Sequence, residues 1–460
     1  MRLPTEFEER MKNLLGEDFG AFSTAMETPP VRSFRINTLK SAPENTEAKK
    51  LAKKPLSFCS EGFIFEAEHI GAHPLHHSGA IYIQEPAAMA AVECVDIEPG
   101  MKILDVCASP GGKTTQAAAK LSGEGIIITN EIDTARCRVL AQNVERMGIR
   151  NAVVTNTDSA SLGELYHKFF DLVIVDAPCS GEGMMRKNPL AVSEWSMDNV
   201  LMCAQRQKEI LNNVADTVKP GGKLLYSTCT FAPEENEDRI ACFLAEHSDF
   251  KLIPVSERVA AVTEEGIAIK GEELRLCRRF YPHVSKGEGQ FMALLLRDEN
   301  VEETSGENKR KKDKEKEGKA QRVNPDELAI KDFLASVLTA EGIKEIEKYT
   351  LICDKNGVFG LGPKISLPNA LRPYCVPIGT VQKGRVIPHH NFFSAYGRLF
   401  RLRIELAEDD DRVSAYLHGE SIRCDCENGF AAVLYCGAPL GGVKVTGGEA
   451  KNHYPKGLRT

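Results

Sequence analysis

The sequence is poor in several features that would mark a specialised class of protein. It has one tryptophan, 7% aromatic residues and no excess of basic charge, since its formal net charge is −7. A tight, non-specific binder of nucleic acid would be strongly basic, so that class is excluded, although a local basic groove is not. No window reaches the roughly 18 apolar residues of a membrane span. Residues 1–19 lack the apolar core of a secretory leader, so we expect a cytoplasmic protein.

Cysteine is present without the spacing of a disulfide scaffold or a zinc site. The 14 cysteines follow no dense, regular pattern, which favours free thiols in a reducing compartment. Cys424 and Cys426 are too close for the usual zinc spacing, and no second pair balances them. We therefore expect no metal.

The length of 460 residues predicts more than one domain. Changes in pattern divide the chain into an N-terminal segment (1–90), a central domain (91–297), a linker (298–322) and a C-terminal region (323–460). The linker is nearly all charged, with a basic run over residues 309–314, and such a composition cannot bury a core.

The central domain alternates strands with helices, which predicts a mostly parallel α/β sheet. The expected strands are 102–106, 125–129, 152–156, 172–175 and 223–226, and the expected helices are 112–121, 133–147, 162–168 and 194–218. Segments 274–281 and 290–296 flank a glycine-containing turn and predict an antiparallel hairpin at the sheet edge.

Shorter elements are expected on both sides of this domain. In the N-terminal segment, residues 3–15 predict a helix, and three short segments (33–39, 57–65 and 80–83) predict strands. The C-terminal region begins with an expected helix over 326–340. Many short strands with glycine and proline turns follow it, which indicates a small helix-plus-barrel module.

A glycine-rich turn follows the first central strand. Residues 107–114 read Cys-Ala-Ser-Pro-Gly-Gly-Lys-Thr and lead into a helix. Small residues there let the backbone approach a ligand closely, and the start of the helix offers free N–H groups. The turn matches neither the G-x-G-x-x-G of a dinucleotide fold nor the G-x-x-x-x-G-K-[ST] of a P-loop.

Acidic side chains follow the next three strands. Glu131 ends the second strand, where a carboxylate can bind both ribose hydroxyls, Asp158 ends the third, and Asp176 ends the fourth. Each acid alone is more often a helix cap or a solvated turn residue. As a set beside the glycine-rich turn they favour an adenosyl ligand without phosphates, and S-adenosyl-L-methionine fits better than ATP or NAD.

Two cysteines also stand at expected strand ends, Cys179 in Asp-Ala-Pro-Cys-Ser-Gly and Cys229 in Ser-Thr-Cys-Thr. A thiolate that adds to carbon-6 of cytosine activates carbon-5 for methylation, and an acid such as Asp176 can bind ring nitrogen-3. The base must be single-stranded or flipped out. A buried hydrophobic role is the better interpretation for most of the other cysteines, but the strand-end contexts favour function for these two. The residues alone leave open which of the two is the nucleophile.

At these positions the chain resembles the Nol/Nop/Sun family of RNA cytosine carbon-5 methyltransferases, especially its bacterial RsmF-like members, which modify small-subunit ribosomal RNA. The resemblance rests on residues 107–114, 176–183 and 227–230 and extends to residues 35–40 and 82–87. It implies a Rossmann-like methyltransferase core with a mostly parallel seven-stranded sheet, a small α+β N-terminal segment and a C-terminal PUA-like module that binds RNA.

The resemblance also implies the role of each site residue. Cys229 would be the nucleophile and Cys179 would assist release of the methylated RNA, with Asp176 at the base. S-adenosyl-L-methionine would be held by Cys107, Ala108, Ser109, Pro110, Gly111, Gly112, Lys113, Glu131, Asp158 and Asp176. The partner would be 16S ribosomal RNA or the 30S subunit, with no DNA or membrane partner, and we expect a monomer.

Several further residues are candidates for RNA contact. Arg186 and Lys187 follow the Asp176 motif, where a backbone phosphate can pass, although a solvated pair is an equal alternative. Residues 379–390 and 440–444 resemble the PUA-like region. Its candidate phosphate ligands are Lys383, Arg385 and Arg398. Tyr374, Phe392 and Phe393 can stack on bases, but core packing is favoured.

Two alternatives to a ribosomal RNA enzyme stay open. A transfer-RNA cytosine methyltransferase would have the same fold and chemistry. A non-catalytic RNA-binding ribosome-assembly factor is the other alternative, and the intact Cys179, Asp176 and Cys229 argue against it.

Overall fold

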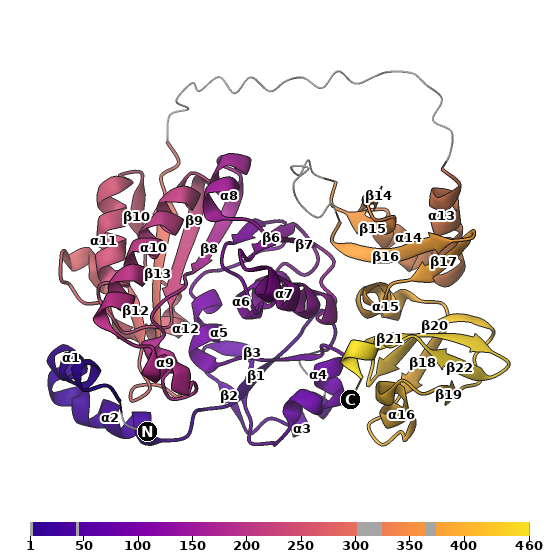
Figure 1. Cartoon of the computed structure of the whole chain (residues 1–460), viewed down its shortest axis with the longest axis horizontal. Helices are drawn as coiled ribbons and strands as arrows, with labels where there is room; N and C mark the ends of the chain where they lie inside the picture. Colours follow the sequence, from indigo (N-terminus) through magenta and orange to yellow (C-terminus); the bar gives the residue numbers. More distant parts are fainter. Residues whose placement is uncertain (1–2, 43–45, 301–323, 365–373, 460) are drawn as a thin grey trace.

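The computed structural model describes residues 3–42, 46–300, 324–364 and 374–459. An N-terminal helical pair and a small sheet precede the central α/β domain, and the C-terminal module lies beside it, next to α7 (Thr134–Arg146) (Figure 1). Within the described ranges, no helix combines the length and the apolar character needed to cross a bilayer. Most of the expected linker lies outside the described residues.

The central domain is built on a nine-stranded sheet in the order β11-β12-β13-β9-β8-β5-β6-β7, with β10 paired to β13. Its strands are β5 (Lys102–Asp105), β6 (Ile126–Asn130), β7 (Ala152–Thr155), β8 (Phe170–Asp176), β9 (Val218–Thr228), β10 (Phe250–Leu252), β11 (Glu264–Glu265), β12 (Arg278–Phe280) and β13 (Gln290–Arg297). The five strands from β9 to β7 are parallel, and the others are antiparallel. The expected number of seven is therefore too low, because β10 and β11 are too short to show a pattern.

Alternate residues of the central strands face opposite sides of this sheet. Leu104 and Ile128 pack into one apolar core, whereas Ile103 and Ile127 pack into another. Helices cover the faces: α5 (Pro86–Glu93), α6 (Gly112–Lys120), α7, α8 (Ser159–Leu165), α9 (Pro189–Ser193), α10 (Met197–Ala215), α11 (Glu237–Glu246) and α12 (Glu257–Ala260). Each parallel strand is thus buried on both sides, and its reactive chemistry is confined to the strand end.

The expected helix over 194–218 is wrong at both ends. A separate helix, α9, begins at Pro189, and Ser196 caps a new start by accepting the Asn199 N–H. At the other end, Val218 already belongs to β9, which runs through the proline-glycine-glycine segment with a register shift against β8. The expected hairpin is confirmed in its strand pairing, since β12 pairs antiparallel with β13.

The N-terminal segment forms a four-stranded antiparallel sheet in the order β2-β3-β1-β4. The strands are β1 (Ser33–Ile36), β2 (Lys54–Leu56), β3 (Cys59–Ile64) and β4 (Ile81–Ile83), and the helices are α1 (Thr5–Leu15), α2 (Phe19–Glu27), α3 (Thr46–Lys50) and α4 (Pro74–His77). The segment 57–65, expected as one strand, belongs mainly to β3, which pairs with both β1 and β2.

The C-terminal region contains two curled sheets, ordered β14-β15-β16-β17 and β18-β20-β21-β22-β19. The strands are β14 (Thr350–Cys353), β15 (Val358–Gly362), β16 (Val376–Gln382), β17 (Arg385–Pro388), β18 (Arg403–Leu406), β19 (Ile422–Arg423), β20 (Gly429–Tyr435), β21 (Ala438–Thr446) and β22 (Glu449–Asn452). The helices are α13 (Pro325–Val337), α14 (Ala340–Ile346), α15 (His390–Tyr396) and α16 (Arg412–His418). Helix α15 packs on α7 of the central domain.

A buried lysine joins the three parts of the chain. The Lys40 Nζ donates to the carbonyl oxygens of Ser78 at 2.7 Å and Arg146 at 2.9 Å, to the Ser394 hydroxyl at 2.6 Å and to the Pro439 carbonyl at 3.1 Å. Burial, followed by nearby arginines, lowers the pKa of Lys40 well below its usual value. The side-chain nitrogen of Lys40 thus connects the N-terminal segment, α7 and the C-terminal module.

Candidate active site

Two thiols meet at the carboxyl edge of the parallel sheet. Cys179 lies three residues beyond β8, and Cys229 directly follows β9. The two strands are parallel neighbours, and Asp176 stands opposite Ser227 in their register. Their sulfur atoms consequently lie 3.2 Å apart. The structure brings together the two cysteines that the sequence places in separate motifs.

The contact between the two sulfurs changes the acidity of Cys179. The hydrogen bond with Cys229, and next burial, raise the pKa of the Cys179 thiol well above its usual value. Cys179 therefore favours its protonated form and can donate its S–H to the sulfur of Cys229.

Asp176 is held beside the thiols by three polar groups. One of its carboxylate oxygens lies 2.7 Å from the Lys113 Nζ. The other accepts hydrogen bonds from the Ser227 hydroxyl at 2.7 Å and from the Gln290 side chain at 3.4 Å. Because about a third of the Asp176 side chain is exposed, it can still meet a ligand. Asp176 therefore stands as a fixed carboxylate between Lys113 and open space.

A cavity of about 210 Å³ adjoins Asp176. Its lining includes most of the predicted cofactor residues, namely Cys107, Ala108, Ser109, Pro110, Gly112, Lys113 and Asp176. Gly111 shapes the turn, because it adopts φ +109° immediately before α6 and an added Cβ would lie 3.2 Å from the Leu140 side chain. The structure thus brings the glycine-rich turn and Asp176 to one cavity.

The other two predicted acids do not line this cavity. Glu131 is buried at the end of β6 and accepts a hydrogen bond from the Asp133 N–H at 3.0 Å. Asp158 caps α8 by accepting the Ser161 N–H at 2.8 Å, and this bond lowers the pKa of its carboxyl. Their roles in cofactor binding stay predictions.

Sequence reasoning missed Asp105, which also lines the cavity. Its Oδ2 accepts a hydrogen bond from the Thr114 hydroxyl at 2.6 Å, whereas its Oδ1 is buried and has no partner in the part of the chain that the structure describes. Burial raises the pKa of Asp105 to about 7. Its position as the last residue of β5, directly before the glycine-rich turn, was the available signal. A buried oxygen without a partner beside a cavity is suited to a ligand donor.

A second missed group is a pair of buried carboxyls behind the thiols. Glu235 accepts hydrogen bonds from the Ser180 N–H at 3.0 Å, from the Ser180 hydroxyl and from Gln207 at 2.7 Å. Glu182 accepts hydrogen bonds from the Thr230 hydroxyl and the Phe231 N–H, both at 3.0 Å. Burial raises the pKa of both carboxyls, that of Glu235 to about 7. In the sequence these acids resemble solvated turn residues, so only the fold reveals their contacts.

Several predicted RNA-contacting residues are engaged within the protein. Arg186 forms a double hydrogen bond with Glu288 at 2.9 Å for each contact, and its side chain is nearly buried. Arg398 donates to the carbonyls of Gly437 and Lys40. Tyr374, Phe392 and Phe393 are buried, which agrees with the core role favoured from the sequence. Lys383 and Arg385 are exposed where β16 turns into β17.

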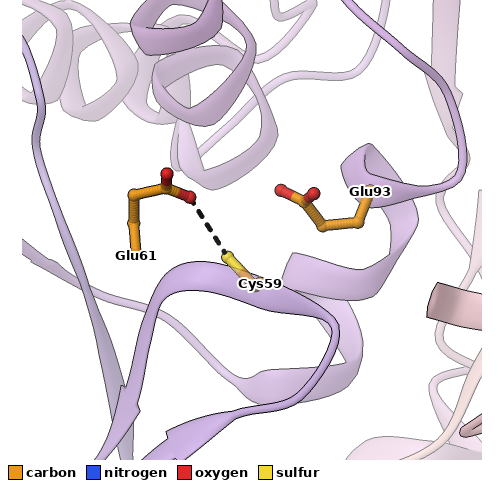
Figure 2. Close-up of side chains that lie close together, drawn as sticks. All are labelled: Cys59, Glu61 and Glu93. Atoms are coloured by element: carbon orange, nitrogen blue, oxygen red, sulfur yellow. Dashed lines mark hydrogen bonds between the residues drawn. The ribbon is translucent and has the colours of Figure 1, made fainter.

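Three further side chains form a potential metal-ligand group, shown in Figure 2: Cys59, Glu61 and Glu93, whose ligand atoms all lie within 4.8 Å of one another. Glu93 already pairs with Lys120 at 2.9 Å and Arg258 at 3.2 Å. Burial raises the pKa of the Cys59 thiol to about 12, which opposes the thiolate that a metal requires. We therefore assign these three side chains a structural role.

Comparison with known families covers all three parts of the chain. Residues 3–86 match the N-terminal domain of 16S rRNA methyltransferase RsmF, residues 92–296 match 16S rRNA methyltransferase RsmB/F, and residues 403–460 match the methyltransferase RsmF PUA domain. A solved methyltransferase homologue from Pyrococcus horikoshii is 32% identical, and the match covers 64% of this chain and 95% of that one, with a TM-score of 0.57. The chain belongs to the RsmB/F methyltransferase family.

Two curated proteins are similar to this chain over about two thirds of its length. The ribosomal RNA small subunit methyltransferase F of Enterobacter sp. (strain 638) is 35% identical over 314 residues, which are 65% of this chain and 64% of that protein. The protein of the same name from Vibrio parahaemolyticus is 34% identical over 317 residues, with the same coverage. The chain thus spans 64% of the length of these family members.

The solved structure of NSun6 from Pyrococcus horikoshii with SFG shares the fold. It is 22% identical with a TM-score of 0.55, and the match covers 65% of this chain and 99% of that one. The family expected from the motifs, the methyltransferase core and the C-terminal PUA module are all confirmed.

Proposed function

We propose that this chain methylates carbon-5 of a cytosine in RNA and uses S-adenosyl-L-methionine as the methyl donor. One arrangement carries the proposal: two thiols 3.2 Å apart follow adjacent parallel strands, and Asp176, at the end of one of these strands, lines the neighbouring cavity. A thiolate and a carboxylate beside a cofactor cavity are the groups that activation of carbon-5 requires.

Cys229 is the nucleophile in this proposal. The hydrogen bond with Cys229, and next burial, raise the pKa of the Cys179 thiol, and the family resemblance assigns the nucleophile to Cys229. In this role the Cys229 sulfur can accept a hydrogen bond from the S–H of Cys179, 3.2 Å away.

The remaining residues act on the cytosine ring. The Cys229 thiolate forms a bond to carbon-6. The displaced electron pair takes up a proton at ring nitrogen-3, and Asp176 shares this proton with the base. Lys113, 2.7 Å from Asp176, fixes that carboxylate. S-adenosyl-L-methionine, when bound, supplies an electrophilic methyl group to carbon-5. The carbon-5 proton then passes to solvent, the bond to sulfur breaks, and its electron pair returns to Cys229 while Cys179 hydrogen-bonds the departing sulfur. The proton at nitrogen-3 leaves through Asp176, which restores the neutral base.

The cavity fits the proposed methyl donor in charge and in shape. Asp105 presents a buried oxygen that has no hydrogen-bond partner among the described residues, which suits an N–H donor such as the ammonium of the ligand. Ala108, Ser109 and Gly112 line the cavity. Their side chains are small, so an adenosyl group can approach the backbone of the glycine-rich turn closely. Glu131 and Asp158 remain the proposed ligands of the ribose and the adenine amino group.

The proposed substrate is 16S ribosomal RNA, free or in the 30S subunit, in the cytoplasm. The support is the family itself, because the matching families and the curated relatives are described as methyltransferases of this RNA or of the small ribosomal subunit. The exposed Lys383 and Arg385 of the C-terminal module suit contact with its phosphates.

Methyl transfer to unmodified small-subunit RNA tests the proposal. With tritiated S-adenosyl-L-methionine, the protein should label carbon-5 of cytosine, Cys229→Ala should abolish turnover, and Cys179→Ala should accumulate a covalent RNA adduct that migrates slowly in a denaturing gel. Cys353→Ala, at an exposed cysteine of the C-terminal module, is the matched control. An adduct in Cys229→Ala and none in Cys179→Ala would reverse the roles. RNA binding without methyl transfer by the wild-type protein would favour the non-catalytic alternative, and transfer to tRNA alone would favour the tRNA enzyme.

A further inference from the structure

A second cleft, of about 430 Å³, adjoins the cofactor cavity. Ile83, Gln84 and Glu85 line both spaces. The cleft is also bordered by Arg32, directly before β1, and by Lys187, eight residues after Cys179 on the segment that carries this thiol. A ligand in this cleft would therefore lie next to the site where the target base must enter.

Arg32 presents a flat, fixed cation to this cleft. Its guanidinium lies 4.8 Å from the centre of the Phe65 ring, and its Nη2 donates to the Ala67 carbonyl at 2.7 Å. Phe65 is buried, whereas Arg32 is exposed. One face of the guanidinium is thus covered by an aromatic ring, and the other face and most of its five N–H donors stay available.

Lys187 supplies a second positive charge, which is held by a long ion pair with Glu288. Its Nζ is 3.9 Å from the nearest Glu288 oxygen, and Glu288 is already bound twice by Arg186 at 2.9 Å. The acid on the cleft wall, Glu85, is also occupied, because its oxygens accept the N–H groups of Ala88 at 2.9 Å and Glu288 at 2.7 Å. The balance of available charge in the cleft is positive.

We propose that this cleft binds the single-stranded RNA next to the target cytosine. A neighbouring base stacks on the open face of the Arg32 guanidinium, and the backbone phosphates meet Arg32 and Lys187. Stacking on arginine planes and contact of phosphates with basic side chains are the usual means of binding unpaired RNA. The inference rests on the proposed function for the identity of the ligand, and it adds a strand-binding site to the catalytic edge of the sheet.

Binding of a short, unstructured, fluorescent RNA with one cytosine to the full-length protein tests this site. Arg32→Ala and Lys187→Ala should each weaken binding by about five- to ten-fold, and each should reduce the slope of log affinity against log salt by about one. Arg32→Lys keeps the charge but loses the plane, so it should keep the salt slope and still bind more weakly. Lys251→Ala is the control, since Lys251 is exposed on β10, at the opposite end of the sheet from the thiols.

The outcomes separate the cleft from the catalytic proposal. If Arg32→Ala and Lys187→Ala bind RNA with the same affinity as the wild-type protein and the Lys251→Ala control, the cleft proposal is wrong. This holds even if the wild-type protein methylates RNA. If these variants weaken binding but the wild-type protein transfers no methyl group, the cleft stands and the catalytic proposal falls. Unchanged thermal unfolding and unchanged affinity for S-adenosyl-L-methionine show that the variants are folded.

Discussion

Ser180 and Thr230, which each follow one of the two thiols, share a hydrogen bond of 2.9 Å between their hydroxyl groups. Glu235 binds the Ser180 side of this contact, and Glu182 binds the Thr230 side. The loops that carry Cys179 and Cys229 are therefore fastened to each other by a buried polar network. Such a network holds both sulfurs in one geometry before any substrate arrives.

Removal of the Thr230 hydroxyl should slow methyl transfer. In Thr230→Val the contacts with Ser180 and Glu182 are lost at nearly constant volume, so we expect kcat to fall about ten-fold or more. The unfolding free energy should fall by about 1–3 kcal/mol, because Glu182 loses a buried donor. Single-turnover methylation and urea unfolding measure the two effects. Thr24→Val, at an exposed hydroxyl on α2, is the control, and equal behaviour of the two variants would contradict the role of the network.

The buried Glu235 carboxyl should make stability depend on pH. Its pKa is raised from 4.5 to about 7 in the folded protein, so folding favours the protonated form. This contribution is fully present below about pH 4.5 and is lost as the pH rises through about 7, with a limit of about 3 kcal/mol. Glu235→Gln cannot titrate, so urea unfolding between pH 5 and pH 8 should show a smaller decrease for this variant. A decrease as large as that of wild type would contradict the prediction, and the exposed Glu265→Gln controls for the substitution.

Lys40 should contribute to stability well beyond an ordinary surface lysine. Lys40→Met keeps the length of the side chain but leaves three carbonyl oxygens and the Ser394 hydroxyl without their donor, so we expect a loss of about 3 kcal/mol in unfolding free energy. A double-mutant cycle with Ser394→Ala should show coupling across the contact with the C-terminal module. Lys49→Met, exposed on α3, should change stability little. Additive effects of Lys40→Met and Ser394→Ala would contradict this connection.

The RNA affinity of the C-terminal module is best tested by surface substitutions. Deletion of residues 323–460 would expose the apolar core that α15 shares with the central domain, so its effect on binding would be mixed with unfolding. Lys383→Ala combined with Arg385→Ala should instead weaken binding to small-subunit RNA by about ten-fold at low salt and leave cofactor affinity unchanged. Filter binding and calorimetry measure the two affinities. Unchanged RNA affinity of the double variant would remove these residues from the interface.

Much of the fold follows from local patterns in the sequence. The alternation of apolar strands and capped helices predicts the parallel strands β5 to β9 and the edge pairing of β12 with β13. The helix over 194–218 was wrong because its ends depend on capping by Ser196 and on a strand that continues through proline and glycine. Short strands such as β11 form through pairing with a neighbouring strand, so no local sequence pattern predicts them.

The candidate site also combines residues that local motifs predict with residues whose roles only the fold reveals. Motifs at strand ends predict Cys179, Cys229 and Asp176, because the carboxyl ends of parallel strands meet at one edge. Glu182 and Glu235 have no such signal, since their importance comes from burial and from partners distant in sequence. Asp105 carried the signal of a strand end, but its burial and its open oxygen appear only in the fold. Asp158, an acid at an expected strand end, caps α8, and its role in cofactor binding stays a prediction.

The four-way contact of Lys40 limits how this protein can be recombined. Two of its four acceptors, the Ser394 hydroxyl and the Pro439 carbonyl, come from the C-terminal module. A chimera that imports this module from a relative must bring matching oxygen atoms to the same two places. Otherwise the buried Lys40 nitrogen loses two of its four acceptors at the contact between the parts. Exchange of the module is therefore constrained by one amine in the N-terminal segment, far from the residues being exchanged in sequence.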